Sequence, residues 1–239
     1  MADIVKVSWS GGKDSSCAVM LHLEQGHKVK AVCYIPMFTE TIPLLLKEHY
    51  EFILRTADRF RSLGAEVQIV TGMTYYDFVH KRSSRGKFKG RMFGFPCFWT
   101  GKCGFKRDSK VKALDTVSIG KYDYEDVGIA FDETARHSIL NEHKRSILYE
   151  LKMSENDAKQ YDLQHDLLSP HYEILTRDGC TLCPHAKAKE RESYGFSNTL
   201  RLFLLFLNYK NLLKENDPTK LHSVIINGLL KRTELLTKY

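Results

Sequence analysis

Through the first third of the chain, the spacing of apolar and polar residues alternates between that of a strand and that of a helix. Ile4 to Trp9 alternates as a half-buried strand does, and Asp14 to Gln25 has helical spacing and ends before Gly26. Lys28 to Tyr34 is rich in β-branched residues and predicts a second strand. Thr41 to Leu63 predicts a long helix and Glu66 to Val70 a third strand. This order of elements indicates a parallel sheet with helices on both faces.

The pattern is less regular after Val70. Tyr75 to His80 and Ser109 to Asp115 predict short helices, and Ser154 to His165 predicts a helix that begins at a serine cap. Asp126 to Phe131 and Ser146 to Leu151 are the candidates for a fourth and a fifth strand. We therefore expect a doubly wound α/β fold with a mostly parallel, five-stranded sheet.

Two segments depart from this alternation. Residues 81–107 are rich in Gly, Lys, Arg and aromatic side chains without sustained periodicity, and they predict a long functional loop. Residues 196–239 predict a C-terminal helical extension, interrupted at Asn216-Asp217-Pro218. The organisation that we expect is one α/β domain over residues 1–195, followed by this extension.

The turn between the first strand and the first helix carries the clearest chemical signal. It reads Ser10-Gly11-Gly12-Lys13-Asp14-Ser15-Ser16 and is called the Ser10–Ser16 loop below. Glycines let the backbone approach an anion, serine hydroxyls add donors, and a helix N-terminus favours negative charge. The spacing fits neither a Walker loop nor a dinucleotide fingerprint. The alternative is an ordinary turn in which Asp14 or Ser15 caps the helix.

The charge of the chain is concentrated in one region. Between His80 and Lys112 there are eleven basic residues and a single acid, so this segment carries +10 while the whole chain carries +7. Phenylalanines and Trp99 are interleaved with the charges, as in surfaces that bind a nucleic-acid backbone and stack on its bases. The candidate substrate-binding residues are Arg85, Lys87, Lys89, Arg91 and Lys106. A small phosphorylated substrate fits this composition equally well, and so does a solvated surface loop.

The six cysteines fall into two groups. Cys17 and Cys33 lie within apolar patterns and are expected in the core. The other four lie in loops that contain glycine or proline, and they are Cys97, Cys103, Cys180 and Cys183. These four could form a thiolate site for zinc or an iron–sulfur cluster. A sulfur-carrying thiol activated by Lys102, Lys106 or Arg177, or plain loop packing, are the alternatives.

The Ser10–Ser16 loop resembles the Ser-Gly-Gly-x-Asp-Ser signature of the PP-loop ATP pyrophosphatases, which have the adenine nucleotide α-hydrolase-like fold. Three later elements follow the order seen in the phosphoadenosine phosphosulfate (PAPS) reductase-like members. They are Cys103-Gly104-Phe105-Lys106, then Asp132-Glu133 with Arg136, and then Gly179-Cys180-Thr181-Leu182-Cys183-Pro184. The resemblance spans roughly residues 4 to 195.

The resemblance implies an enzyme that binds ATP with Mg²⁺ and activates a substrate by adenylation, with release of pyrophosphate. Some such relatives then install sulfur on nucleic acid, or form an amide or a nitrile. Lys13 would neutralise phosphate charge, and Asp14 is placed to meet Mg²⁺ or a donor. Arg136 would clamp a phosphate or a carboxylate, or pair structurally with Asp132 or Glu133.

Two other functions stay open at this point. A sulfonucleotide reductase, which acts on PAPS or APS, carries a catalytic cysteine near its C-terminus, and here no cysteine follows Cys183. A non-catalytic nucleotide sensor or nucleic-acid-binding protein would retain the fold without the reaction. The partners that we expect are an adenine nucleotide and either tRNA, DNA or a phosphorylated small molecule, and a homodimer is compatible with the sequence.

The expected location is the cytoplasm. The chain enters a strand without a signal peptide, and it has no apolar run of about 18 residues that could span a bilayer, so we expect no membrane partner.

Overall fold

The computed structural model describes residues 2–86, 89–90, 103–173, 179–181 and 183. The predicted C-terminal extension, Cys97, Lys87 and Arg91 lie outside these residues. The strands are β1 (Ile4–Trp9), β2 (Lys28–Tyr34), β3 (Glu66–Val70), β4 (Tyr124–Val127) and β5 (Lys144–Arg145). The helices are α1 (Lys13–Glu24), α2 (Lys47–Ser62), α3 (Tyr75–His80), α4 (Lys112–Thr116), α5 (Thr134–His137), α6 (Ile147–Glu150) and α7 (Glu155–Gln164), with the π-helical turn η2 (Lys106–Val111) and the 3₁₀ turn η3 (Pro170–Glu173).

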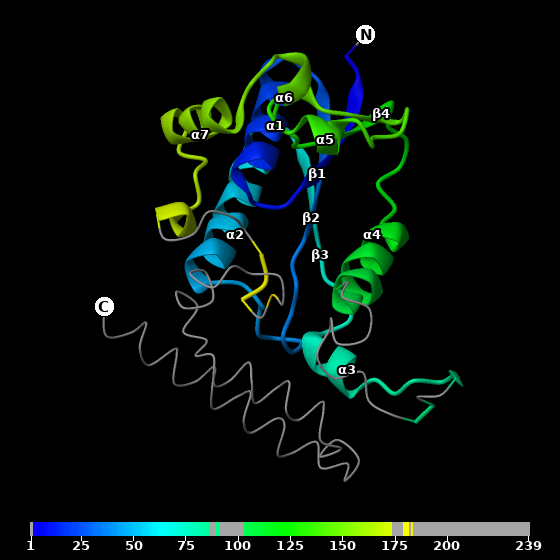
Figure 1. Ribbon diagram of the computed structural model, residues 1–239. Helices are drawn as coiled ribbons and strands as arrows, with labels where there is room; N and C mark the ends of the chain where they lie inside the picture. Colours follow the sequence, from blue (N-terminus) through cyan, green and yellow to red (C-terminus); the bar gives the residue numbers. More distant parts are fainter. Residues whose placement is uncertain (1, 87–88, 91–102, 174–178, 182, 184–239) are drawn as a thin grey trace, which may run out of the picture.

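The sheet has five parallel strands in the order β3-β2-β1-β4-β5. Figure 1 shows α1 and α2 on one side of the strands and α4 on the other, which is the doubly wound arrangement. The strand order reverses at β1, because β2 and β3 lie to one side of it and β4 and β5 to the other. In open α/β sheets, ligands bind beyond the carboxyl ends of the strands at such a switch point. The Ser10–Ser16 loop follows β1 directly and therefore lies there.

The predicted fold class is confirmed, but several elements differ from the sequence prediction. The fourth strand was expected at Asp126 to Phe131, whereas β4 is Tyr124–Val127. The fifth strand was placed at Ser146 to Leu151, and this was wrong: β5 is the short pair Lys144–Arg145, and Ile147–Glu150 is the helix α6. Ser146 caps that helix, and Ile147 and Leu148 are both buried. A short apolar run of this kind has no period that separates a strand from a buried helical turn.

The long second helix begins later than its apolar spacing predicts, at Lys47 rather than at Thr41. Pro43 lies in the intervening segment and pairs with Met37 in an isolated β-bridge, and the Leu44 N–H donates to the Pro36 carbonyl (2.7 Å). The residue before a proline is disfavoured in the helical region. These contacts keep the segment extended up to Leu46.

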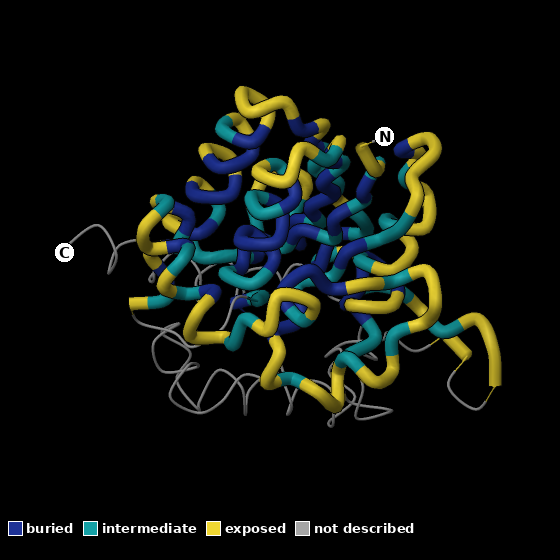
Figure 2. The backbone as a smooth tube through the Cα atoms, turned by 90° about the horizontal axis from the view of Figure 1, so that it is seen from above, coloured by how far each residue is buried: buried dark blue, intermediate teal, exposed yellow. Residues whose placement is uncertain are grey.

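The core lies between the sheet and the helices that flank it. Figure 2 shows the buried stretches gathered at the centre of the molecule and the exposed turns around them. Val5, Val7 and Ala31 of the central strands are fully buried, as are Cys17 and Ala18 of α1. Cys17 and Cys33 are thus core residues, as predicted. Every helix within the described residues is too short or too polar to cross a membrane.

Candidate functional site

Two glycines set the shape of the Ser10–Ser16 loop. Gly11 has a φ of +78°, in the left-handed region that favours glycine. A Cβ atom there would overlap the side chain of Ile53 and lie 3.2 Å from His49 Cε1, and both of these residues belong to α2. Gly12 is the N-cap of α1, with an extended backbone conformation. The loop therefore rests closely on α2, and only glycine fits at position 11.

The serines of the loop bind one another. The Ser15 hydroxyl donates to the Gly12 carbonyl (3.0 Å) and accepts from the Ser10 N–H (3.1 Å). Because Ser15 has one proton, the Ser10 hydroxyl is the donor in their mutual contact (3.1 Å), and it accepts from the Gly12 N–H (3.3 Å). Ser16 is fully buried and accepts a hydrogen bond from the Trp9 indole (3.0 Å). These bonds hold the loop in one shape without a ligand.

Gly128, the residue after β4, packs against the first turn of α1. A Cβ atom on Gly128 would lie 2.6 Å from the backbone nitrogen of Ser15 and 2.7 Å from the carbonyl carbon of Asp14. Backbone therefore packs directly on backbone between the end of β4 and the first turn of α1. This contact places the chain after Gly128, including Asp132 and Glu133, beside the loop.

Lys13 lies at the centre of a charged cluster. Its ammonium donates to both carboxylate oxygens of Asp14 (3.0 and 2.8 Å) and lies 3.1 Å from Oε2 of Glu155, the first residue of α7. Burial alone would lower the pKa of Lys13, but its bonds to Asp14 and Glu155 outweigh burial and raise the pKa. Burial raises the pKa of Asp14; Lys13 opposes this, and the charges of Glu155 and Glu133 add to it. Lys13 therefore stays charged at neutral pH.

The main chain of Lys13 is also engaged. Its N–H, in the first turn of α1, donates to the hydroxyl of Tyr172 in η3 (3.2 Å). First-turn N–H groups have no acceptor within their helix, and they are the groups that bind anions at a helix N-terminus. Tyr172 and Glu155 could not be singled out from the sequence, because they lie far from the loop along the chain.

A buried histidine and serine cluster supports Tyr172. Ser169 Oγ lies 2.9 Å from Nδ1 of His49 and 2.8 Å from Nδ1 of His171, and the two imidazole rings meet edge to face at 4.3 Å between centroids. All three residues are buried. The cluster fixes the start of η3 to α2, next to Gly11.

Asp132, Glu133 and Arg136, which follow β4, make contacts within the protein. Oδ1 of Asp132 accepts from the N–H of Glu155 (3.1 Å), at the start of α7. Arg136 donates to both carboxylate oxygens of Glu133 (2.5 and 2.6 Å), and its side chain is more than half exposed. The structural pairing that the sequence left open is thus present, and the guanidinium remains accessible.

Asp162 is a functional candidate that the sequence did not reveal. It lies on α7, the helix that begins with Glu155, and is fully buried. Neither of its carboxyl oxygens has a hydrogen-bond partner among the described residues. Burial raises the pKa of Asp162 to about 9, with the charge of Asp14 adding to the rise and Lys13 opposing it. It is therefore protonated at neutral pH, within electrostatic reach of the loop.

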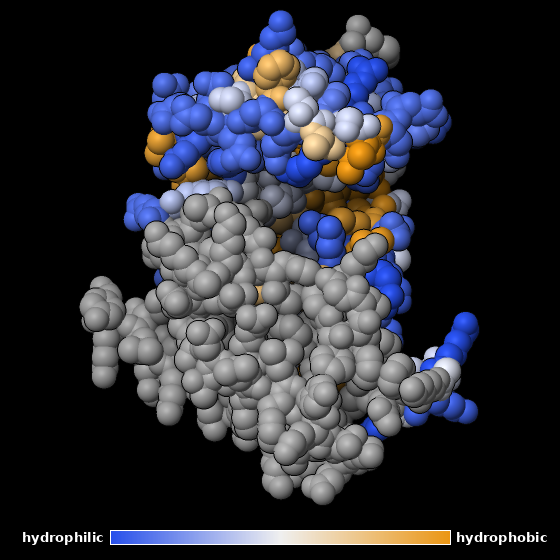
Figure 3. Space-filling view, in the orientation of Figure 1, coloured by the Kyte–Doolittle hydropathy of each residue, from blue (hydrophilic) through white to orange (hydrophobic). Residues whose placement is uncertain are grey.

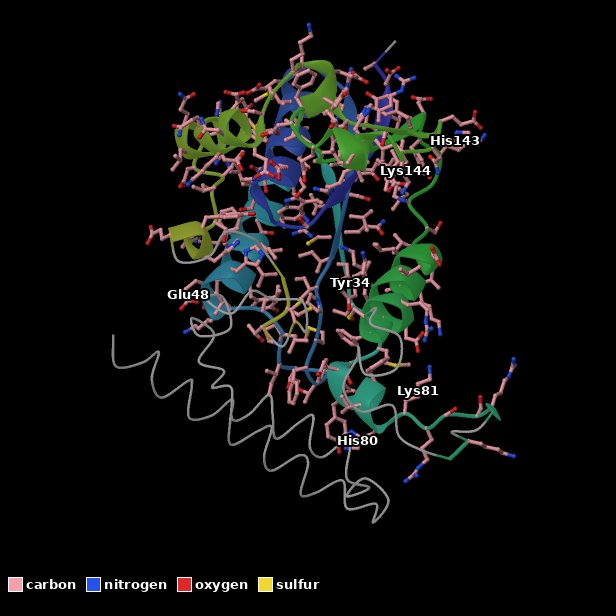
Figure 4. All side chains as sticks on the ribbon, viewed as in Figure 1. Tyr34, Glu48, His80, Lys81, His143 and Lys144 are labelled. Carbon is pink, nitrogen blue, oxygen red and sulfur yellow. The ribbon has the colours of Figure 1, made fainter. Side chains whose placement is uncertain are left out.

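Two of the predicted cysteine ligands, Cys103 and Cys183, affect the pKa of a third, Cys180. Burial raises the pKa of Cys180 to about 12; Cys183 and Cys103 raise it further, and Lys110 lowers it. The Cys183 N–H donates to the Cys180 carbonyl (2.9 Å), and the Lys106 N–H donates to the Cys103 sulfur (3.4 Å). Tyr34, at the end of β2, lies between the strands and α4, and its hydroxyl contacts Ser109 Oγ (2.7 Å; Figure 4). The fold thus brings two segments that are distant in sequence toward the same end of β2.

A high thiol pKa is unfavourable for a sulfur-carrying nucleophile, because the thiolate is the reactive form. The donor set of three thiols fits zinc or an iron–sulfur cluster in chemistry. Within the described residues, however, no group of three metal-ligating side chains is assembled to hold an ion. Cys97, the fourth predicted ligand, lies outside them.

The basic segment is organised around its single acid. Asp108 is buried and accepts from Lys81 (2.7 Å) and Arg107 (2.8 Å), with Lys112 3.7 Å away. Burial alone would raise the pKa of Asp108, but these partners lower it to about 2. Arg85, Lys89 and Lys106 are exposed.

Lys87, Arg91 and most of the interleaved aromatic residues lie outside the described residues. The face seen in Figure 3 is mostly hydrophilic in its upper part, where α5, α6 and α7 lie.

In comparisons with known proteins, no protein-family model matches this chain, and no curated protein matches it either.

Proposed function

We propose that this chain binds ATP at the Ser10–Ser16 loop and transfers adenylate to an acceptor, in the manner of a PP-loop ATP pyrophosphatase. The observation that supports this most directly is the position of the loop. A serine- and glycine-rich turn with a partly buried, charged lysine lies at the switch point of a doubly wound sheet. Such a position, with a helix N-terminus facing it, is a binding site for phosphate groups.

The residues of the site fit the requirements of this reaction. The oxygen of the acceptor attacks the α-phosphorus, a new phosphorus–oxygen bond forms, the bond to the bridging oxygen breaks, and pyrophosphate leaves. The enzyme then has to position the two reactants and to stabilise negative charge. Lys13 is charged and lies at the N-terminus of α1, and Arg136 lies beyond the end of β4 with an accessible guanidinium. Both residues can bind phosphate oxygens.

The carboxylate of Asp14 fits a magnesium ion. It lies 2.8 Å from the Lys13 ammonium, so a hard oxygen donor already faces a cation there. Bound Mg²⁺ would supply neutralisation of the phosphate charge. Asp14 is the residue that we expect to face it.

Nucleic acid or a nucleotide derivative is the acceptor class that we favour. The segment from His80 to Lys112 carries +10, and exposed Arg85, Lys89 and Lys106 belong to it. Phosphate backbones bind such surfaces through counterion release, so we expect binding to weaken as salt rises.

If the loop cysteines bind a metal, zinc would hold their segments together as a structural ion, and an iron–sulfur cluster is the other candidate.

Nucleotide binding is tested by titration calorimetry with Mg²⁺ and α,β-methylene-ATP, which cannot be cleaved at the relevant bond. We expect Lys13→Ala to weaken binding by about tenfold or more, because a charge-assisted contact to phosphate is lost. Lys121→Ala, at an exposed lysine of a turn, is the matched control and should bind like the wild type. Equal binding by Lys13→Ala, or no binding by any of the proteins, would contradict the proposal.

A further inference from the structure

Lys13 has both of its binding groups occupied by the protein itself. The main-chain N–H donates to the Tyr172 hydroxyl, and the ammonium binds Asp14 and Glu155. Tyr172 and Glu155 both belong to the chain that follows β5, far from the loop in sequence. A phosphate group at the N-terminus of α1 would need the same N–H and the same ammonium.

We propose that Tyr172 and Glu155 form a clasp on Lys13 that competes with the phosphates of the nucleotide. In the structure the clasp is closed. Nucleotide binding opens it, because one N–H group cannot serve the phenol oxygen and a phosphate oxygen equally well at the same time. This inference rests on the proposed function, since it concerns the affinity of that same site.

Because the start of η3 is anchored on α2, opening of the clasp at Tyr172 is a local movement. Ser169 and His171 are held on α2 by His49, and they are buried. Tyr172 is the next residue along the chain and reaches from this anchor to the loop. Release of its hydroxyl therefore needs rotation at Tyr172, while Ser169 stays in place.

The geometry of α7 supports the second arm of the clasp. The helix runs alongside α1 in the same direction, with Glu155 near Lys13 at one end and His165 3.6 Å from Glu24 at the other. Figure 1 shows the two helices side by side. Glu155 is about half exposed, so its carboxylate can leave Lys13 without disturbing the packed face of the helix.

The clasp lowers the apparent affinity for nucleotide, because only the open fraction of molecules binds. Removal of one arm should therefore tighten binding. Tyr172→Phe removes the hydroxyl but keeps the ring and the net charge, so its effect is not an effect of altered charge. Glu155→Gln removes the charge that holds the ammonium.

The test is titration calorimetry of the full chain with Mg²⁺ and α,β-methylene-ATP. We expect Tyr172→Phe to bind about three- to tenfold more tightly than the wild type, which is the range for one neutral hydrogen bond. Tyr122→Phe, at an exposed tyrosine, should bind like the wild type. Glu155→Gln should tighten binding more than Glu48→Gln does, because Glu48 is an exposed acid of α2 (Figure 4).

Hydrogen exchange gives a second readout that a purely structural tyrosine would not change. Nucleotide should speed amide exchange in residues 172–173 of the wild type while it slows exchange in residues 10–16. In Tyr172→Phe, exchange in residues 172–173 should be fast before nucleotide is added. Unchanged or weaker binding by Tyr172→Phe overturns the clasp alone. Absence of nucleotide binding by the wild type and both variants overturns the proposed function and the clasp together.

Discussion

Lys13 is the residue on which the contacts of the site converge. Its ammonium binds the carboxylates of Asp14, on its own helix, and of Glu155 on α7, and its N–H donates to the Tyr172 hydroxyl in η3. Gly11 and Gly128 allow backbone and side chains to approach the loop from α2 and from β4. A substitution at either glycine would therefore displace the loop itself.

Asp162 provides a prediction at this scale. Its pKa in the folded protein is about 9 and its ordinary value is 3.8, so the unfolded chain loses this proton at a much lower pH. The stabilising contribution of the protonated form is complete below about pH 4 and is lost as the pH rises toward 9. Asp162→Asn removes this dependence, and the gain in stability should grow by up to about 1.4 kcal/mol for each pH unit in that range.

Thermal unfolding of the wild type and Asp162→Asn at pH 5 and at pH 8 measures the effect. We expect the variant to gain in Tm relative to the wild type, and to gain more at pH 8. Asp115→Asn, at an exposed aspartate of α4, should show no such difference between the two pH values. A constant difference across the two pH values would show that Asp162 ionises normally.

The elements were predictable where their pattern is long and local. The first three strands, α1 and most of α2 follow directly from apolar spacing and from glycine stops. The helix α7 follows from Ser154 and Asp157, which form a capping box. Residues 144 to 151 were not predictable, because β5 is only two residues long and the apolar run after it is a buried helical turn.

The cysteine segments meet because of the order of the elements. Cys103 precedes η2, which packs against the end of β2 through Tyr34 and Ser109, and Cys180 follows η3. The Thr181 N–H donates to the Leu44 carbonyl (3.0 Å), which fixes the second segment beside α2. Sequence spacing identified these cysteines as a group, but the proximity of the two described segments follows from the topology.

If these cysteines hold a metal, elemental analysis of purified protein should find zinc or iron at about one site per chain. Cys180→Ser should lose most of this metal, because a neutral hydroxyl replaces a thiolate ligand. Cys17→Ser is the matched control, since Cys17 is buried between α1 and the sheet and should have no effect on metal content. Metal-free wild-type protein would leave loop packing as the explanation of the cysteines.

At the scale of the whole molecule, the loop was located from the sequence, and the fold places it at the switch point of the sheet. The partners of Lys13 were not predictable. Glu155 and Tyr172 are ordinary residues in their own segments, and they become part of the site because α7 and η3 pack beside α1 and α2. Two roles were open for Arg136 from the sequence, a clamp on a ligand and a structural ion pair, and in the structure Arg136 pairs with Glu133.

We propose that ATP bound at the loop is cleaved between its α- and β-phosphates. ATP labelled at the γ-phosphate is incubated with the full chain, Mg²⁺ and bulk tRNA or DNA, and the labelled product is identified. We predict labelled pyrophosphate from the wild type and none from Asp14→Ala, whose thermal stability should be nearly unchanged. Labelled orthophosphate, or no cleavage with any acceptor in spite of tight nucleotide binding, would contradict the account.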